Sequence, residues 1–300
     1  MSLSDLLTEQ INPDSRGIDR LPTMEMLRLI NNEDHKVAAA VQVEIPNIAR
    51  AVDAIVEVAA RGGRLFYIGA GTSGRLGVLD AAECPPTFHV PPELVQGIIA
   101  GGEPALARAT ETTEDAPARG KDDLIGHGFT RADALVGIAS SGRTPYVLGA
   151  IDAARELAAL TVGISCTPDS LLAHQVDIAI TPLVGPEVIA GSTRMKAGTA
   201  TKLVLNMIST GVMIRLGYVY GNLMVNVQPR NSKLEDRARR IIAESAGVTY
   251  ERATELLRES GGEISTAIVM SQLAINRAEA QAKLAAAHGR ISEALKNNHG

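Results

Sequence analysis

The sequence has 300 residues, 45% of them hydrophobic and only 3% aromatic, with a formal net charge of −5. This length allows one large domain or two smaller ones, with a core built mainly from Ala, Val, Ile and Leu. The acidic balance argues against nucleic acid as a partner, two cysteines are too few for a disulfide framework, and the first residues lack the apolar segment of a signal peptide. The most apolar helix candidate, 203–220, is interrupted by Asn206 and Arg215, so we expect a cytoplasmic protein without a membrane span.

The N-terminal fifth of the chain is expected to be an arm followed by helices. Residues 1–22 lack clean periodicity and are interpreted as an extended arm, which either packs on a partner subunit or is a surface tail. Thr23 is a candidate cap for a helix through Asn31, and Asp34 for a second helix over 37–61. Pro46 predicts a kink or break in that second helix.

A glycine turn after the first predicted strand is the strongest local signal. The short apolar run 65–68 fits a buried parallel strand, and the stretch Gly-Ala-Gly-Thr-Ser-Gly over 69–74 follows it. Its glycines permit a tight turn into a helix from about Gly74, and free amide groups at a helix start bind anions. Thr72 and Ser73 add hydroxyl donors, which suit the terminal oxygens of a phosphomonoester.

The same spacing also satisfies the dinucleotide fingerprint G-x-G-x-x-G, so a Rossmann nucleotide site is an alternative. The acidic residue expected about 20 residues on is not clearly placed, because Glu103 follows the second strand late. We favour the phosphomonoester.

Strands and helices then alternate, which predicts a doubly wound five-stranded parallel sheet with helices on both faces. The helix after the first strand is expected to stop before Pro85. An acidic cluster at 111–115 is bracketed by helices over 104–109 and 116–125. The remaining predicted strands and helices are strands 94–100, 134–139, 160–164 and 177–180, and helices 145–158 and the long one ending at Leu216.

Hydroxyl-rich turns follow three of these strands, at 72–73, 140–144 and 165–168. The carboxyl ends of parallel strands meet at one edge of a sheet, where ligands of open α/β sheets bind. Several such loops are therefore expected to converge on one phosphate.

The last seventy residues are predicted to be helical only, over 234–243, 249–257 and 264–295, with a small three-helix appendage within 248–271. This gives three parts: N-terminal arm and helices at 1–50, a phosphosugar-binding domain at 51–230, and a C-terminal helical region at 231–300.

Four stretches resemble the sugar-isomerase (SIS) phosphosugar-binding fold and, within it, the N-acetylmuramic acid 6-phosphate etherase family. They are the glycine turn with the Asp-Ala-Ala-Glu-Cys-Pro-Pro of 80–86, the Ser-Ser-Gly-Arg-Thr-Pro of 140–145, Gly-Pro-Glu at 185–187, and the block 191–202. The last block is similar to a signature shared with glucokinase regulatory proteins. The resemblance covers nearly the whole chain.

The resemblance implies cleavage of the ether between D-lactate and C3 of N-acetylmuramic acid 6-phosphate, by elimination and then water addition, in cell-wall recycling. It implies no metal or organic cofactor, and a homodimer. It places the two catalytic carboxylates on Glu83 and Glu114. Phosphate binding falls on Thr72, Ser73, Ser140, Ser141 and Thr144.

The chemistry needs one group to take the C2 proton and one to protonate the leaving oxygen, so two carboxylates in different environments suit it. Glu83 lies before the double proline, where a helix C-terminus disfavours ionisation, so we expect it to be the acid. Glu114 lies in a polar, Thr-rich loop and is expected to be the base. Taken without the family, a solvated surface Glu is the commoner explanation for either residue.

Other reactive residues carry weaker signals. The six histidines lack metal-ligand spacing, and Cys84 has no neighbouring His and is interpreted as a packing residue. Arg194, Lys196 and Lys202 are candidates either to neutralise the lactyl carboxylate or to form salt bridges within the dimer. Three other functions stay open: an aldose–ketose isomerase on the same fold, a non-catalytic phosphosugar sensor, and, with less support, a DNA-binding regulator.

Overall fold

In the computed structural model, residues 7–108, 113–227 and 232–296 are described. Predicted features at 1–6, at Glu111 and Thr112 of the acidic cluster, at 228–231 and at 297–300 lie outside these ranges. No helix in the described ranges has both the length and the apolar character needed to cross a bilayer.

The predicted five-stranded parallel sheet is confirmed, with strand order β2-β1-β3-β4-β5. Every predicted strand is found within one or two residues of its expected ends. The strands are β1 (Leu65–Gly69), β2 (Val95–Ile99), β3 (Ala134–Ile138), β4 (Leu160–Ile164) and β5 (Ile178–Ile180).

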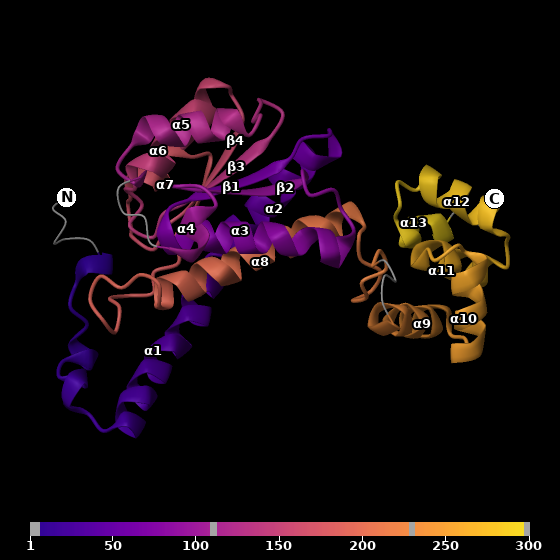
Figure 1. The fold of residues 1–300 in the computed structure, drawn as a ribbon, viewed down its shortest axis with the longest axis horizontal. Helices are drawn as coiled ribbons and strands as arrows, with labels where there is room; N and C mark the ends of the chain where they lie inside the picture. The colour runs from indigo at the N-terminus through magenta and orange to yellow at the C-terminus, as the bar shows by residue number, and fades with distance from the viewer. Residues whose placement is uncertain (1–6, 109–112, 228–231, 297–300) are drawn as a thin grey trace. The chain divides into compact units, whose positions relative to one another are not determined.

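Helices cover both faces of the sheet, as predicted, with α5 and α6 on one side and α3 and α8 on the other (Figure 1). The first face is closed by a core that includes Phe66, Leu124, Leu135 and Ile151. On the other face α3 packs closely: a Cβ on Gly77 would lie 2.9 Å from the Cβ of Tyr67. The helices between the strands are α3 (Gly71–Phe88), α4 (Pro104–Ala107), α5 (Pro117–Gly126), α6 (Pro145–Glu156) and α7 (Leu171–Gln175), and α8 (Lys196–Leu216) follows β5.

The N-terminal helices differ from the prediction at one point. Helix α1 (Thr23–Val43) covers the first expected helix and the beginning of the second, and Asp34 lies inside it rather than capping a second helix. The break predicted at Pro46 is confirmed, because α2 (Ile45–Ala60) begins with this proline in its first turn, where the missing amide costs nothing. Three single-turn 3-10 helices precede α1, namely η2 (Leu7–Glu9), η3 (Pro13–Ser15) and η4 (Ile18–Arg20).

The predicted end of α3 is wrong. The helix starts at Gly71, three residues earlier than expected, and runs through Pro85 and Pro86 to Phe88. Prolines in a helix interior remove hydrogen bonds to the preceding turn, at about 3 kcal/mol each. Burial of Cys84 and Phe88 offsets this cost, since both side chains are less than 8% exposed.

An ion pair joins the amino-terminal ends of β1 and β3. The Asp133 carboxylate accepts two bonds from the Arg64 guanidinium, at 3.0 and 2.9 Å, and one from the Arg64 amide at 2.9 Å. Burial alone would raise the pKa of Asp133, but the hydrogen bonds from Arg64 and Thr130 outweigh it and lower this pKa. The pair therefore stabilises the sheet at the end opposite the hydroxyl loops.

The C-terminal helices share one hydrophobic core that includes Ile242, Leu256, Ile268 and Leu284. The single run predicted over 264–295 is wrong, because Ala274 adopts a left-handed conformation and Asn276 starts a new helix with a capping box. All five helices contribute to this core, so no separate three-helix appendage stands out within 248–271. They are α9 (Ser232–Ala246), α10 (Tyr250–Glu259), α11 (Ile264–Leu273), α12 (Arg277–Ala286) and α13 (Ile291–Lys296).

The chain divides into two compact units. One comprises 1–82 and 92–209 and contains the sheet; the other comprises 83–91 and 210–300 and contains the helical core just described.

Candidate functional site

Two hydroxyl loops leave neighbouring strands at the same edge of the sheet. Gly69, which ends β1, lies beside Ile138, which ends β3, in the parallel register. The strand order reverses at this pair, because the chain runs from β1 outward to β2 and then returns to β3 on the other side. Such a switch point opens a crevice at the carboxyl ends of the strands, where α/β sheets bind ligands.

The first loop is a tight glycine turn. A Cβ on Gly74 would lie 2.6 Å from the carbonyl oxygen of Gly69, so only glycine lets the helix start this close to the strand. Thr72 and Ser73 are half-buried in the first turn of α3. The amide groups of a first helical turn have no intrahelical partner and favour anions. The turn therefore offers both amide and hydroxyl donors.

The second loop, 140–144, is held firmly by its neighbours. The Ser140 carbonyl accepts bonds from the Cys166 amide at 2.8 Å and the Thr167 hydroxyl at 3.3 Å. Gly142 has φ of +64°, and a Cβ there would lie 2.2 Å from the Cβ of Ser170. This loop is thus fixed from the β4 side, with the side chains of Ser140, Ser141 and Thr144 half-buried.

Cys166 does not act as a nucleophile in this loop. Its side chain is buried, and burial together with the nearby Glu187 carboxylate raises the pKa of the thiol to about 12. The thiol stays protonated at neutral pH, so we interpret Cys166 as a packing residue.

Glu114 lies beside the second loop. Its backbone carbonyl accepts a 3.0 Å hydrogen bond from the amide of Tyr146, two residues after Thr144. Its side chain is half-buried in the turn that precedes α5. The structure therefore places the backbone of Glu114 next to the start of α6, which follows the second hydroxyl loop directly.

Glu83 is placed differently. It is exposed on α3, five residues before the helix ends at Phe88, and it belongs to the segment grouped with the C-terminal helices. The predicted position at the last residues before the helix end was wrong, since the helix does not stop at Pro85. Glu83 therefore lies away from the helix C-terminus, whose partial negative charge would favour its protonated form.

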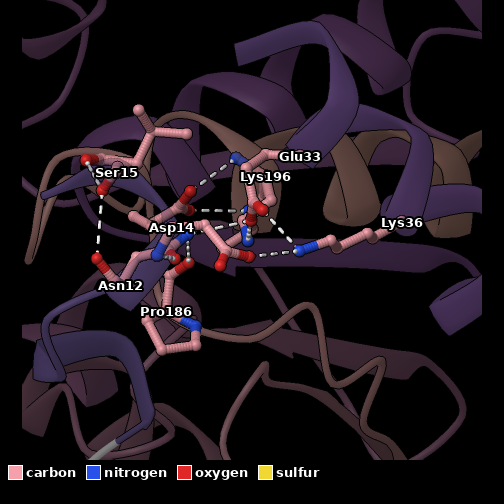
Figure 2. Close-up of polar contacts among 10 residues, drawn as sticks. Asn12, Asp14, Ser15, Glu33, Lys36, Pro186 and Lys196 are labelled. Carbon is pink, nitrogen blue, oxygen red and sulfur yellow. Dashed lines mark hydrogen bonds and ion pairs between the residues drawn. The ribbon is translucent and has the colours of Figure 1, made fainter. Parts of the chain in front are cut away.

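Lys196 is not available to a substrate. Its side chain is 1% exposed, and its ammonium donates a 2.6 Å bond to the Glu33 carboxylate (Figure 2). Glu33 also accepts bonds from Lys36 and, at 2.9 Å, from Asn12. Burial would raise the pKa of Glu33, but its bonds to Lys196 and Lys36 lower it, so the carboxylate is charged. The ion pair that the structure shows for Lys196 lies within this chain, whereas the sequence left open a contact with the lactyl carboxylate or a salt bridge within the dimer; Arg194 and Lys202 are exposed.

The N-terminal arm fastens the loop that leads to Lys196. Asn12 donates to the carbonyl of Pro186 at 3.2 Å, and the Ser15 hydroxyl to the carbonyl of Val188 at 2.8 Å (Figure 2). No pattern in the sequence pointed to these contacts, because they join residues more than 170 positions apart. The arm is a structural part of the sheet unit rather than a surface tail.

Glu187 caps the start of α8. Its buried carboxylate accepts bonds from the amides of Lys196 and Ala197, at 3.0 and 2.9 Å. Burial raises the pKa of Glu187 despite these bonds. Gly198, two residues on, lies against the first loop: a Cβ there would be 3.4 Å from the Cγ2 of Thr72. The Glu187 cap thus positions the helix start beside the glycine turn.

No three His, Cys, Asp or Glu side chains gather with metal-binding geometry within the described residues.

Relatives with established names align along the whole chain. N-acetylmuramic acid 6-phosphate etherase from Caldanaerobacter subterraneus subsp. tengcongensis is 52% identical over 296 residues, covering 99% of this chain and 97% of its own. The protein of the same name from Cronobacter sakazakii is also 52% identical, covering 99% of this chain and all of its own. This chain belongs to the N-acetylmuramic acid 6-phosphate etherase family. The resemblance seen in the sequence motifs is thereby confirmed.

Two further similarities concern parts of the etherase chain. The family model described as the glucokinase regulatory protein N-terminal SIS domain matches residues 47–155. Among solved structures, a putative phosphosugar isomerase involved in capsule formation from Bacteroides fragilis is 22% identical, with a TM-score of 0.49, covering 66% of this chain and 94% of its own.

Proposed function

We propose that this chain cleaves the D-lactyl ether of N-acetylmuramic acid 6-phosphate, giving N-acetylglucosamine 6-phosphate and D-lactate in cell-wall recycling. Identity of 52% over nearly all of two etherases supports this reaction. The observation that carries the proposal is local: the loops of Ser73 and Ser141 start from paired strands at the point where the strand order reverses.

The phosphate is proposed to bind in the crevice between these two loops. The hydroxyls of Thr72 and Ser73, with the first amides of α3, face the charge from one side. Ser140, Ser141 and Thr144 supply hydroxyls from the other. These donors are uncharged, so they bind the phosphate dianion by hydrogen bonds alone. They place no positive charge beside the nearby carboxylates, which are therefore not drawn into ion pairs.

The proposed reaction has two halves. Glu114 takes the C2 proton, the C3–O bond breaks with its electron pair going to the lactyl oxygen, and that oxygen takes a proton from Glu83. The product is lactate and an unsaturated open-chain sugar aldehyde. Glu83, now a carboxylate, takes a proton from water as the hydroxyl adds to C3. C2 takes a proton from the Glu114 carboxyl group, which by then has exchanged its proton with solvent.

Support for the two carboxylates is unequal. Glu114 is fixed beside the phosphate loop through Tyr146. Glu83 has its place in the motif Asp-Ala-Ala-Glu-Cys-Pro-Pro as support, and its side chain is exposed to solvent. The assignment of Glu83 as the acid is therefore the part of the proposal that most needs a direct test.

Isotope labelling tests the mechanism. Product formed in deuterium oxide is expected to carry deuterium at C2, and product formed in ¹⁸O water is expected to carry the label at C3. Product that keeps its original C3 oxygen would show cleavage on the lactyl side and contradict the elimination. Absence of lactate release would contradict the etherase activity itself.

The working form is proposed to be a cytoplasmic homodimer. Helix α1 carries the large exposed apolar side chains Met24 and Leu27, at 62% and 53%, and α8 carries Ile214 at 50%. Apolar exposure of this kind marks interaction surfaces. Both cysteines are buried thiols, which suits a reducing compartment. Light scattering on a sizing column tests the dimer, and a monomeric mass at micromolar concentration would contradict it.

A further inference from the structure

A cavity of about 590 Å³ lies along the edge of the sheet beside β2. None of the residues proposed to bind phosphate lines it. Cavities of this size hold small ligands. The polar groups and strand residues that line it include Gly97, Ile99, Glu103, Arg119, Asp123 and His127.

The cavity contains the open edge of a strand. β2 is the first strand of the sheet and pairs with β1. The Leu65 amide donates to the Leu94 carbonyl and the Ala100 amide to the Gly69 carbonyl, so the even-numbered residues of β2 face β1. Gly97 and Ile99 therefore direct their amides outward. The outward carbonyl of Ile99 accepts the Gly102 amide at 2.9 Å, so a ligand on this edge pairs with the two amides and with the Gly97 carbonyl.

One face of α5 supplies charges of both signs. Arg119 and Asp123 lie one turn apart on α5, and His127 follows as the C-cap residue, so the three form a row with about 6 Å between successive members. Arg119 has no ion-pair partner within the described ranges. It lies in the first turn of α5, which follows the carboxyl end of β2 in the chain.

The middle of the row is preorganised. The Tyr146 hydroxyl donates a 2.7 Å bond to the Asp123 carboxylate, and burial and then this carboxylate raise the pKa of Tyr146, so the hydroxyl remains a donor. The Nδ1 of His127 donates to the Asp123 carbonyl at 2.7 Å. The Nε2 of a neutral His127 is then an acceptor.

We propose that this cavity binds a short peptide of two or three residues as an added strand on β2. The peptide backbone pairs with Gly97 and Ile99, its carboxylate binds Arg119, and its ammonium binds Asp123 and His127. The lengths agree, because two extended residues span about 6.6 Å and one turn of α5 separates Arg119 from Asp123 by about 6 Å. A strand edge supplies affinity through the backbone and the charged row supplies selectivity for free termini.

The proposal does not rest on the proposed sugar reaction, although Thr113, which precedes Glu114, and Tyr146 also line the cavity. It is tested with trialanine on the full chain. Amide signals of Gly97 and Ile99 are expected to shift in nitrogen–proton spectra, and their hydrogen exchange to slow. Acetylated trialanine amide, which keeps the backbone but loses both charges, is expected to bind at least tenfold more weakly.

Variants locate the site. Arg119→Gln is expected to weaken trialanine binding at least tenfold, whereas Arg131→Gln, an equally exposed arginine in the turn before β3, is expected to leave it unchanged. Saturating N-acetylglucosamine 6-phosphate is expected not to displace the peptide. Unchanged Gly97 and Ile99 signals, equal affinity in Arg119→Gln, or displacement by the sugar phosphate would each overturn the proposal.

Discussion

The carbonyl oxygen of Glu114 accepts a 3.0 Å hydrogen bond from the amide of Tyr146, the second residue of α6. This bond joins two segments that the chain separates by about thirty residues and that carry different proposed roles. Glu114 is the proposed base, and the loop just before Tyr146 carries Ser140, Ser141 and Thr144. Since the bond involves only backbone atoms, substitutions of the Glu114 side chain leave this placement intact.

Glu114→Gln is therefore expected to lower kcat for lactate release by about three orders of magnitude, which is within the range for removal of a general base, with little change in KM. Asp115→Asn, the exposed neighbouring carboxylate, is the matched control and is expected to keep normal rates. A Glu114→Gln enzyme with near-normal kcat would remove this residue from the mechanism.

Glu83→Gln is expected to lower kcat for lactate release by a similar factor. The double variant is expected to be at most a few fold slower than the slower of the two single variants, because the two groups act on one substrate. Exposed Glu93 on the following loop provides the control Glu93→Gln. If Glu83→Gln stays fast while Glu114→Gln is slow, another group supplies the proton to the leaving oxygen.

Gly142→Ala is expected to destabilise the second loop. The new Cβ would require left-handed backbone and would overlap Ser170, so we expect a loss of about 2 kcal/mol in unfolding free energy and weaker binding of sugar phosphate. Gly126→Ala, at the end of α5, meets nothing within 4 Å and is expected to be neutral or slightly stabilising. Urea unfolding measures the unfolding free energy of both variants, and titration with sugar phosphate measures their binding. Equal effects from the two substitutions would contradict the steric argument.

The sheet was predictable because its signals are local. Each strand is a short apolar run such as 65–68 bounded by glycine or polar residues, and the alternation with helices determines that the strands are parallel. The end of α3 was not predictable from local rules, since Pro85 and Pro86 argue for termination and only the burial of Cys84 and Phe88 opposes it. Local propensity and packing disagree there, and packing decides.

The candidate site was likewise predictable from the sequence only in part. Hydroxyl turns at strand ends predicted the loops of Ser73 and Ser141, because topology alone places them at one edge. Nothing in the sequence connects Asn12 to Pro186 or Glu33 to Lys196, since those contacts depend on where the arm and α1 lie in three dimensions. The position of Lys196 in a signature block suggests a ligand contact. The burial of its side chain shows that it is not available to a ligand.

Lys196→Met is expected to be strongly destabilising. It leaves the buried Glu33 carboxylate without its closest buried cation, and breaking a buried pair costs about 3–5 kcal/mol. Adding Glu33→Leu is expected to recover part of this loss, because the unpaired charge is then gone. Lys202→Met, exposed on the same helix, is the control and is expected to change stability by less than about 0.5 kcal/mol. A Lys196→Met protein as stable as the control would contradict the structural role given to the pair.

The ion pair of Arg64 and Asp133 predicts a specific dependence on pH. Asp133 has a lowered pKa in the folded protein, so between that value and the ordinary one near 4 the unfolded chain binds more protons. Its contribution to stability is therefore complete above about pH 4 and is lost as the pH falls through the folded pKa.

Asp133→Asn is accordingly expected to lower the unfolding free energy by about 2–3 kcal/mol at neutral pH, the range for hydrogen bonds to a charged group. The difference in unfolding free energy between the unsubstituted protein and this variant is expected to shrink on acidification below about pH 4, because the carboxyl group of Asp133 then becomes protonated in both states. Asp152→Asn, at an exposed position on α6, is the control. If urea unfolding gave a difference that stayed constant down to about pH 2.5, Asp133 would not titrate with folding.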